Sequence, residues 1–159
     1  MALEAHPLRD TIRIVIGDWH ALESHATAIR TEVFVAEQHV PAEEELDAED
    51  VHCVHAVAYD GALGVGTGRL LPNAHIGRMA VRKPYRGRGV GARLLETLVV
   101  EARKRGYPEV ILAAQLHAVP FYERHGFVAE GGVFLDAGIE HVNMRRVLAG
   151  ASSRDLSGA

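Results

Sequence analysis

A glycine-rich turn between a strand pattern and a helix pattern constrains this chain most. Residues 86–91 are Arg-Gly-Arg-Gly-Val-Gly, and the preceding segment HIGRMAV (75–81) has the composition of a β-strand. Apolar residues then recur at helical spacing until Gly106, namely Val90, Leu94, Leu98 and Ala102. The turn therefore stands at the N-terminus of a helix that directly follows a strand.

This position predicts that the turn binds an anion. The first N–H groups of a helix lack partners within the helix, and the helix dipole is positive at this end. Gly87, Gly89 and Gly91 have no Cβ to block a ligand, and Arg86 and Arg88 add charged donors. A pyrophosphate is the natural occupant of such a site.

The glycines of this turn also occur in other nucleotide-binding and structural patterns. A Walker A loop requires Gly-Lys followed by Ser or Thr, which the chain lacks. Gly87, Gly89 and Ala92 fit a dinucleotide-binding pattern, but no acidic residue follows a second strand to hold a ribose. A turn that only lets helix and strand pack closely stays open as the structural alternative. The flanking arginines favour anion binding.

Strand and helix patterns alternate along the rest of the chain. We expect strands at residues 12–16, 53–60, 62–71 and 109–115, helices at 20–38 and 118–125, and two last strands joined by a turn at 136–138. The apolar run 109–115 is typical of a central strand covered on both faces, parallel to 75–81. The predicted fold class is α/β (α+β), with a mixed, mostly antiparallel sheet flanked by helices.

The overall composition bounds the class of protein. With 159 residues, 48% of them hydrophobic and 24% charged, the chain is predicted to form one domain over residues 1–150, followed by a disordered tail at 151–159. The single cysteine, Cys53, excludes an internal disulfide framework and a cysteine-based zinc ribbon. No segment has the pattern of a signal peptide or a membrane span, so we expect a cytoplasmic protein without a membrane partner.

Charge is unevenly distributed along the chain, whose formal net charge is −4. Residues 43–50 contain six carboxylates and no base, whereas residues 78–93 contain six bases and no acid. The basic run is short, lies in a turn and has few aromatic neighbours. We therefore expect no nucleic-acid partner.

Two motifs resemble those of the GNAT superfamily of acyl-CoA-dependent N-acyltransferases. VRKPYRGRGVGARLLETL resembles its motif A through Arg86, Gly89 and Gly91, and QLHAVPFYERHGF resembles its motif B. The motif B positions are filled by Gln115, Ala118, Tyr122, Gly126 and Phe127. IRTEVFVAEQHVPAEEELD further resembles the ElaA/YjcF-like branch. The resemblance implies a twisted sheet with splayed central strands and acetyl-CoA as the donor.

The resemblance also implies roles for individual residues. Backbone groups of Met79, Ala80 and Val81 would pair with the pantetheine arm, and an N–H at or near Met79 would polarise the thioester. The residues implied to bind the rest of the coenzyme are Arg86, Gly87, Arg88, Gly89, Val90, Gly91 and Gln115. Tyr122 is implied to donate a proton to the departing sulfur, the alternative being that it is only a packing residue.

The base that would deprotonate an amine is left open by the sequence. The candidates are Glu37, Glu43, Glu44, Glu45, His117, His141 or a chain of waters. The acidic run is either a solvated loop or a means of concentrating a cationic acceptor, with Glu45 and Asp47 as its first residues to mutate. His52 and His55 should face opposite ways, so we predict no metal site.

The expected function is that of an N-acetyltransferase acting on a small-molecule or peptide amine by direct attack in a ternary complex. Cys53 lies outside both motifs, so no acyl-cysteine is expected. A non-catalytic acyl-CoA-binding or regulatory module is the alternative function. A homodimer is compatible with the sequence, which does not identify the acceptor.

Overall fold

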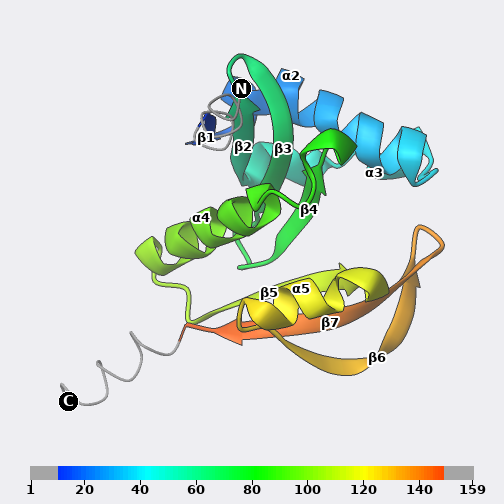
Figure 1. The fold of residues 1–159 in the computed structure, drawn as a ribbon. Coiled ribbons are helices and arrows are strands. Elements are labelled where there is room, and N and C mark those ends of the chain that lie inside the picture. Colours follow the sequence, from blue (N-terminus) through cyan, green and yellow to red (C-terminus); the bar gives the residue numbers. More distant parts are fainter. Residues whose placement is uncertain (1–10, 149–159) are drawn as a thin grey trace, which may run out of the picture.

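The computed structural model describes residues 11–148, which form two half-sheets with helices around them (Figure 1). The predicted tail at 151–159 lies outside the described residues, and the extent of the domain stays a prediction. The elements in chain order are β1 (Ile12–Gly17), α2 (Trp19–Arg30), η2 (Thr31–Glu37), α3 (Ala42–Glu45), η3 (Ala48–His52), β2 (Val54–Asp60), β3 (Leu63–Leu70), β4 (Ile76–Val81), η4 (Lys83–Tyr85), α4 (Val90–Lys104), β5 (Glu109–Gln115), η5 (Leu116–Ala118), α5 (Val119–Arg124), β6 (Val128–Asp136) and β7 (Ile139–Val147).

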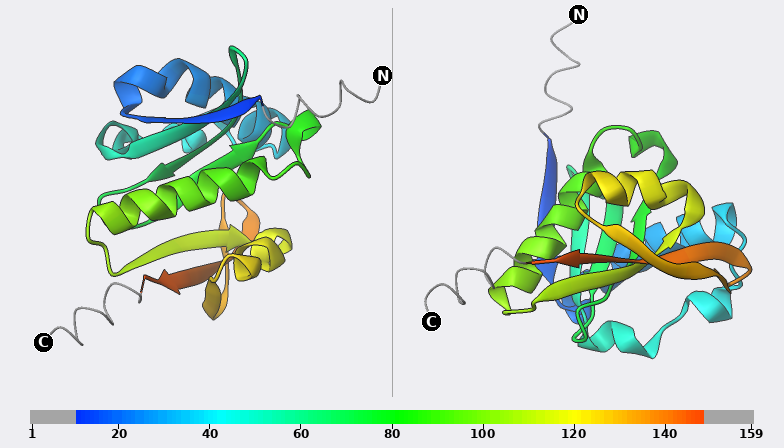
Figure 2. Two further views of the ribbon diagram at one scale, coloured as in Figure 1. Left: turned by 60° about the vertical axis from the view of Figure 1, so that its left-hand side comes forward. Right: turned by 90° about the horizontal axis from the view of Figure 1, so that it is seen from below.

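The strands separate into two antiparallel sheets with the orders β1-β2-β3-β4 and β5-β7-β6. β4 and β5 are joined by one parallel bridge between His75 and Ile111, supported by a 3.1 Å bond from the Ile111 N–H to the Ala74 carbonyl. Beyond that bridge the two strands diverge, and Figure 2 shows the sheets as separate layers. The fold class and the splaying are confirmed, but the parallel pairing extends over a single bridge.

Helix α4 packs in a core that it shares with residues of both sheets. Its apolar side chains recur every three or four residues, so one face of the helix is buried in the main core. That core also includes Val65 on β3, Leu112 on β5 and Met144 on β7. Each fully buried leucine of α4 contributes about 1.5–3 kcal/mol. The packing of α4 therefore fixes the start of the helix relative to both β4 and β5.

Helix α2 covers the other face of the first sheet. Leu22, Ala26 and Ile29 are buried there against Val57 of β2, in a second cluster. The expected helix at 20–38 is α-helical only to Arg30 and continues as a seven-residue π-helix, η2. The wider turn of η2 changes the direction in which its side chains project, which periodicity alone does not reveal.

Strand β5 is not covered on both faces, so that expectation is wrong. Val110, Leu112 and Ala114 are buried, whereas Ala113 between them is exposed. Small apolar side chains make both faces of this strand look alike in sequence, but one of them faces open space. Among residues 11–148, no helix is both long and apolar enough to cross a membrane.

Candidate active site

A β-bulge interrupts strand β4 at its middle. Arg69 pairs with Gly77 and Thr67 with Ala80, so Arg78 and Met79 stand opposite the single residue Gly68. Arg78 has a φ of 50°, in the left-handed region, as expected for a residue that kinks a strand. A Cβ on Gly68 would lie only 2.4 Å from the Met79 sulfur and 3.0 Å from Leu98 Cδ1, so a larger residue there would require the Met79 side chain to move. The hydrogen-bond ladder between β3 and β4 is thus broken at Met79, the residue whose N–H is expected to polarise the thioester.

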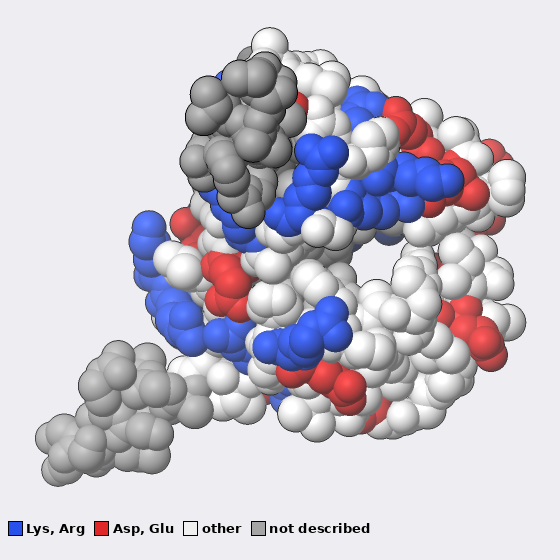
Figure 3. Space-filling view, in the orientation of Figure 1, with Lys and Arg blue, Asp and Glu red and all other residues white. Residues whose placement is uncertain are grey.

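A cavity of about 990 Å³ opens between the diverging strands. Six of the predicted site residues line it: Met79, Ala80, Val81, Arg86, Gln115 and Tyr122. Figure 3 shows the opening between the half that carries α3 and the half that carries the β6–β7 hairpin. The structure therefore brings the residues of β4 and of motif B to one space, although they are more than thirty positions apart.

The glycine turn lies beside this cavity at the start of α4. Gly87 and Gly89 have φ values of 77° and 82°, and Gly89 is an N-cap without a side-chain hydrogen bond. A Cβ built at either glycine would meet no atom within 4 Å, so open space faces both residues. Val90 is buried, whereas Arg88 stacks on the Tyr85 ring at 5.2 Å. The N-terminus of α4 has no side-chain cap, and we call the open space at Gly87 and Gly89 the cradle. Both features fit the predicted pyrophosphate.

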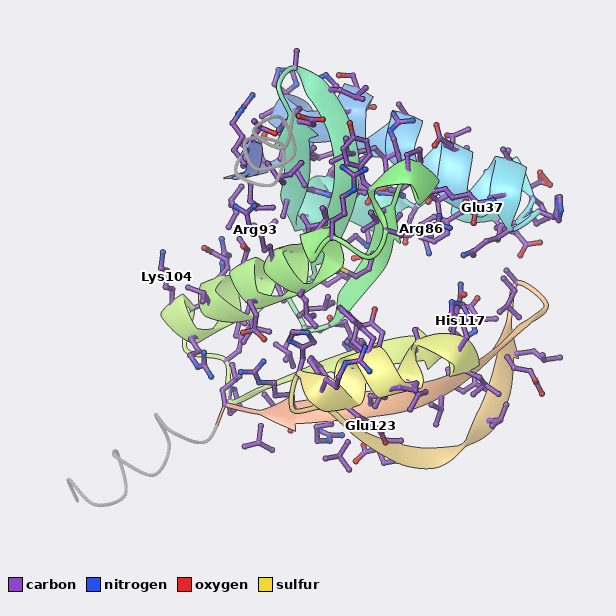
Figure 4. The ribbon with its side chains drawn as sticks, viewed as in Figure 1. Glu37, Arg86, Arg93, Lys104, His117 and Glu123 are labelled. Carbon is purple, nitrogen blue, oxygen red and sulfur yellow. The ribbon has the colours of Figure 1, made fainter. Side chains whose placement is uncertain are left out.

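Arg86 has a partner that its motif does not indicate. Its Nη1 and Nη2 donate to the two carboxylate oxygens of Glu37, each over 2.7 Å, and its Nε donates to the Val81 carbonyl. Figure 4 labels the two side chains on neighbouring elements. The hydrogen bond from Arg86 is the main reason that the pKa of Glu37 lies below its usual value; burial opposes it, and the charges of Arg86 and Lys83 add to the lowering. A phosphate that binds Arg86 must compete with this carboxylate.

Gln115 also makes a bond that the sequence does not predict. Its Nε2 donates to Gln38 Oε1 over 2.9 Å, which joins β5 to the segment after η2 across the opening between the sheets. Both amides line the cavity. The motif B amide is thus held at the cavity wall by a residue 77 positions away.

Tyr122 is a buried phenol in the wall of the cavity. Its ring packs edge-on against Phe121 and Phe127, at centroid distances of 5.1 and 5.8 Å. The hydroxyl makes no hydrogen bond to any residue in the range 11–148, yet it is not among the fully buried unbonded atoms. Burial raises the pKa of Tyr122 to about 12. The group is therefore protonated at neutral pH and can donate a hydrogen bond into the cavity.

The bulged strand β4, the glycine turn and the helix with Tyr122 follow one another along the chain as motifs A and B imply. A family profile described as "Acetyltransferase (GNAT) domain" matches residues 21–148. This chain belongs to the GNAT acetyltransferase family. It is therefore an acyltransferase of the GNAT type, for which the donor is an acyl-CoA.

Relatives place the chain in the ElaA/YjcF-like branch of the GNAT superfamily. The Uncharacterized N-acetyltransferase YjcF of Bacillus subtilis is 44% identical over 122 residues, which are 74% of this chain and 87% of YjcF. The crystal structure of an acyl-CoA N-acyltransferase from Pseudomonas aeruginosa has a TM-score of 0.76 at 32% identity, covering 86% of this chain and 99% of that one. For Escherichia coli ElaA the TM-score is 0.77 at 25% identity, covering 85% and 99%.

In this GNAT chain the acidic run forms part of a buried ion-pair network with three arginines. Arg30 pairs with Glu45 (2.8 Å) and Asp50 (2.9 Å), and Arg69 pairs with Asp50 and Asp47, each at 2.7 Å. Glu45 and Asp50 are 6% and 4% exposed. Both interpretations of the run are wrong for these two residues, because they are neither solvated nor free to attract a cation. Sequence patterns did not single out Arg30 or Arg69.

The network extends to the bulge of β4. The Arg78 Nε lies 3.1 Å from Glu45 Oε2, and its Nη2 donates to the Glu45 carbonyl over 3.2 Å. Arg78 is the bulge residue with positive φ, so its side chain ties the kink to the acidic segment. Burial, followed by the charge of Arg69, lowers the pKa of Arg78, although the nearby carboxylates oppose this shift. The segment 43–50 thereby supports the strand that lines the cavity.

The candidate bases fall into different environments. Glu44, His117 and His141 line the cavity and form no ion pair with any described residue, whereas Glu37 and Glu45 are paired with arginines. Figure 4 labels His117 on the lower half of the molecule, below Glu37 and Arg86. Glu43 is exposed and is not part of the cavity wall. Geometry therefore separates candidates that look equivalent in sequence.

Cys53 is a buried thiol away from the cavity. Its sulfur donates to the Glu49 carbonyl over 3.2 Å, and burial raises its pKa to about 11. A thiol that stays protonated is a poor nucleophile. Within residues 11–148, no group of three or more His, Cys, Asp or Glu side chains is arranged to hold a metal.

Proposed function

We propose that this GNAT protein transfers an acetyl group from acetyl-CoA to a primary amine of a small molecule or peptide, by direct attack in a ternary complex. The observation that carries the proposal is the cavity between β4 and β5, which the bulge, Arg86 and the protonated Tyr122 all line. Its volume lies within the range of small-molecule sites.

The residues of β4 and of the turn are proposed to hold the donor. The backbone at Met79–Val81 pairs with the pantetheine arm, and the Met79 N–H stabilises negative charge on the carbonyl oxygen. The open N-terminus of α4, with Gly87, Arg88, Gly89, Val90 and Gly91, binds the pyrophosphate together with Arg86. Gln115 contacts the donor from β5.

Tyr122 is proposed to assist the leaving group. Sulfur acquires negative charge as its bond to carbon breaks, and a neutral phenol facing the cavity can donate a hydrogen bond to it. The pKa of about 12 keeps this donor protonated during turnover. Cys53, which is buried and lies elsewhere, supports direct attack over transfer through an acyl-cysteine.

Two carboxylates favour an amine as acceptor. Glu44 of helix α3 and Asp136 of strand β6 both line the cavity, and neither forms an ion pair with another residue of the range 11–148. The arginines of the wall, in contrast, are already paired with carboxylates. An acceptor that arrives as a cation is therefore favoured over one that arrives as an anion.

A coenzyme A release screen tests the proposal. Purified protein would be incubated with acetyl-CoA and a panel of polyamines, amino sugars, amino acids and peptides, with acetyl-CoA binding measured in parallel by calorimetry. Release that depends on one class of amine supports the proposal. Tight binding without release from any amine would instead support the acyl-CoA-binding module, and absence of binding would contradict both functions.

A further inference from the structure

The acceptor amine needs a base, because an alkyl ammonium has a pKa of about 10 and no free electron pair. The carboxylates of the cavity wall are poorly suited. Both oxygens of Glu37 accept from Arg86, and Glu45 Oε2 lies between Arg30 and Arg78. Glu44 and Asp136 are exposed, and an exposed carboxylate is a weaker base than an imidazole.

Four histidines line the same cavity, and only one has both a fixed ring and an accessible nitrogen. His39 and His117 are exposed, and no bond to another residue within 11–148 holds their rings. His75 Nδ1 is fully buried and has no hydrogen-bond partner in the described part of the chain. His141, on β7, is 8% exposed, and its Nδ1 lies 2.7 Å from the Ile139 carbonyl oxygen.

The contact to Ile139 determines which nitrogen of His141 is free. A carbonyl oxygen only accepts hydrogen bonds, so Nδ1 carries the proton, and Nε2 of the neutral ring is left with its electron pair. No donor within residues 11–148 satisfies Nε2, and this atom is not among the fully buried unbonded ones. The ring is also stacked on Phe134, with centroids 5.9 Å apart and planes inclined by 24°.

The position of His141 links this nitrogen to the donor side of the cavity. On β7 it stands directly opposite Gln115 of β5, the motif B amide, and opposite Phe134 of β6 on its other side. It is therefore in the middle of the second sheet, held by strand pairing on both sides. A base on a strand that packing and pairing immobilise is oriented before the substrate arrives.

We propose that Nε2 of His141 is the general base that deprotonates the acceptor ammonium. This inference rests on the proposed function. Nε2 takes one proton from the ammonium, and the resulting free amine attacks the thioester carbonyl. The new C–N bond forms as the C–S bond breaks, and the sulfur leaves with the electron pair. The second nitrogen proton passes to that sulfur, which Tyr122 assists, and His141 returns its proton to solvent.

The first test determines the tautomer by long-range ¹H–¹⁵N NMR of the wild-type protein, assigned by comparison with His141→Gln. We expect the neutral ring of His141 to carry its proton on Nδ1, with an unprotonated Nε2 whose resonance shifts when ethylammonium is added. A ring protonated on Nε2, or an Nε2 resonance unaffected by ethylammonium, would overturn the proposal. This arm needs no turnover and no identified acceptor.

The second test is chemical rescue, using the amine found in the release screen. His141→Ala should lose about 10²-fold in turnover and keep its affinity for acetyl-CoA, and added imidazole should restore at least tenfold. The matched control is His25→Ala, because His25 bonds Tyr59 at 2.7 Å outside the cavity; its turnover should be unchanged by imidazole. Unreduced turnover of His141→Ala, or a loss that imidazole does not repair while acetyl-CoA binding is kept, would contradict the role. If the wild-type protein releases no coenzyme A, the proposed function fails, and this inference fails with it.

Discussion

The Arg86 guanidinium and the Glu37 carboxylate form two parallel hydrogen bonds of 2.7 Å between the turn before α4 and the end of η2. Arg86 is also the residue that motif A assigns to the coenzyme. The pair is exposed at the cavity edge, where an ion pair contributes at most about 1 kcal/mol. Under the proposed function, binding of a pyrophosphate would replace the Glu37 carboxylate as the partner of Arg86.

Glu37→Gln should tighten acetyl-CoA binding by up to about fivefold, because the competing carboxylate is removed. Calorimetric titration of the variant measures this directly. Glu32→Gln is the matched control, since Glu32 pairs with Arg82, lies outside the cavity wall and loses the same charge. Equal tightening in both variants would show a general charge effect instead of competition for Arg86.

Tyr122→Phe should lower turnover by about 10²-fold while acetyl-CoA affinity stays nearly constant. Because the pKa of Tyr122 is about 12, no loss of activity near pH 10 should arise from its ionisation. Coenzyme A release measured across pH checks both points. Tyr107→Phe, which changes a phenol outside the cavity wall, should behave as wild type. Unaltered turnover of Tyr122→Phe would remove this residue from the mechanism.

Gly89→Ala should weaken acetyl-CoA binding, because φ is 82° and an alanine Cβ would project into the space kept for the ligand. Placing alanine in this left-handed conformation also lowers the free energy of unfolding by about 1–2 kcal/mol. Gly106→Ala controls for this strain: Gly106 has a φ of 79°, but it lies beyond the far end of α4. Both variants should lose stability, but only Gly89→Ala should lose affinity for acetyl-CoA. An equal loss of affinity in Gly106→Ala would contradict the proposal that the glycine turn binds the pyrophosphate.

Asp50→Asn should lower the free energy of unfolding by about 3–5 kcal/mol, because Arg30 and Arg69 would be left without their shared carboxylate in a buried site. Urea denaturation gives this quantity. Glu101→Gln, which removes an exposed pair with Arg105, should cost no more than about 0.5 kcal/mol. Similar losses in the two variants would mean that burial of the network has little effect.

Ionisation of Asp50 should also make the free energy of unfolding depend on pH in the acidic range. Burial alone would raise its pKa, but the hydrogen bonds and charges of Arg30 and Arg69 outweigh this and hold the pKa below its usual value. A carboxyl group whose pKa is lower in the folded than in the unfolded state stabilises the folded protein. This contribution is fully present above the unfolded-state pKa and is lost as pH falls through the folded-state pKa. Wild type should therefore weaken between about pH 5 and pH 2, and Asp50→Asn should show a shallower slope. Identical slopes of the free energy of unfolding against pH in wild type and Asp50→Asn would exclude Asp50 as a source of the pH dependence.

The regular elements were largely predictable, because they depend on local preferences. The turn at 86–91 and the start of α4 follow from glycines that tolerate positive φ and from helical spacing of apolar residues. Prediction was wrong for β5, whose exposed Ala113 looks like a core residue in sequence, and incomplete for η2, where the helix changes its pitch. Both depend on which neighbours pack nearby.

The sequence by itself determined the fold class, the glycine turn before α4 and the order of motifs A and B, since a turn, a helix start and a periodic face are encoded within a few consecutive residues. Only the tertiary structure decided how charges pair. Arg30 meets Asp50 across 20 positions, and Arg86 meets Glu37 across 49. It also assigned the free nitrogen of His141, through a carbonyl of its own strand. Such contacts are a few ångströms long, and folding alone brings charged groups from distant positions to that separation.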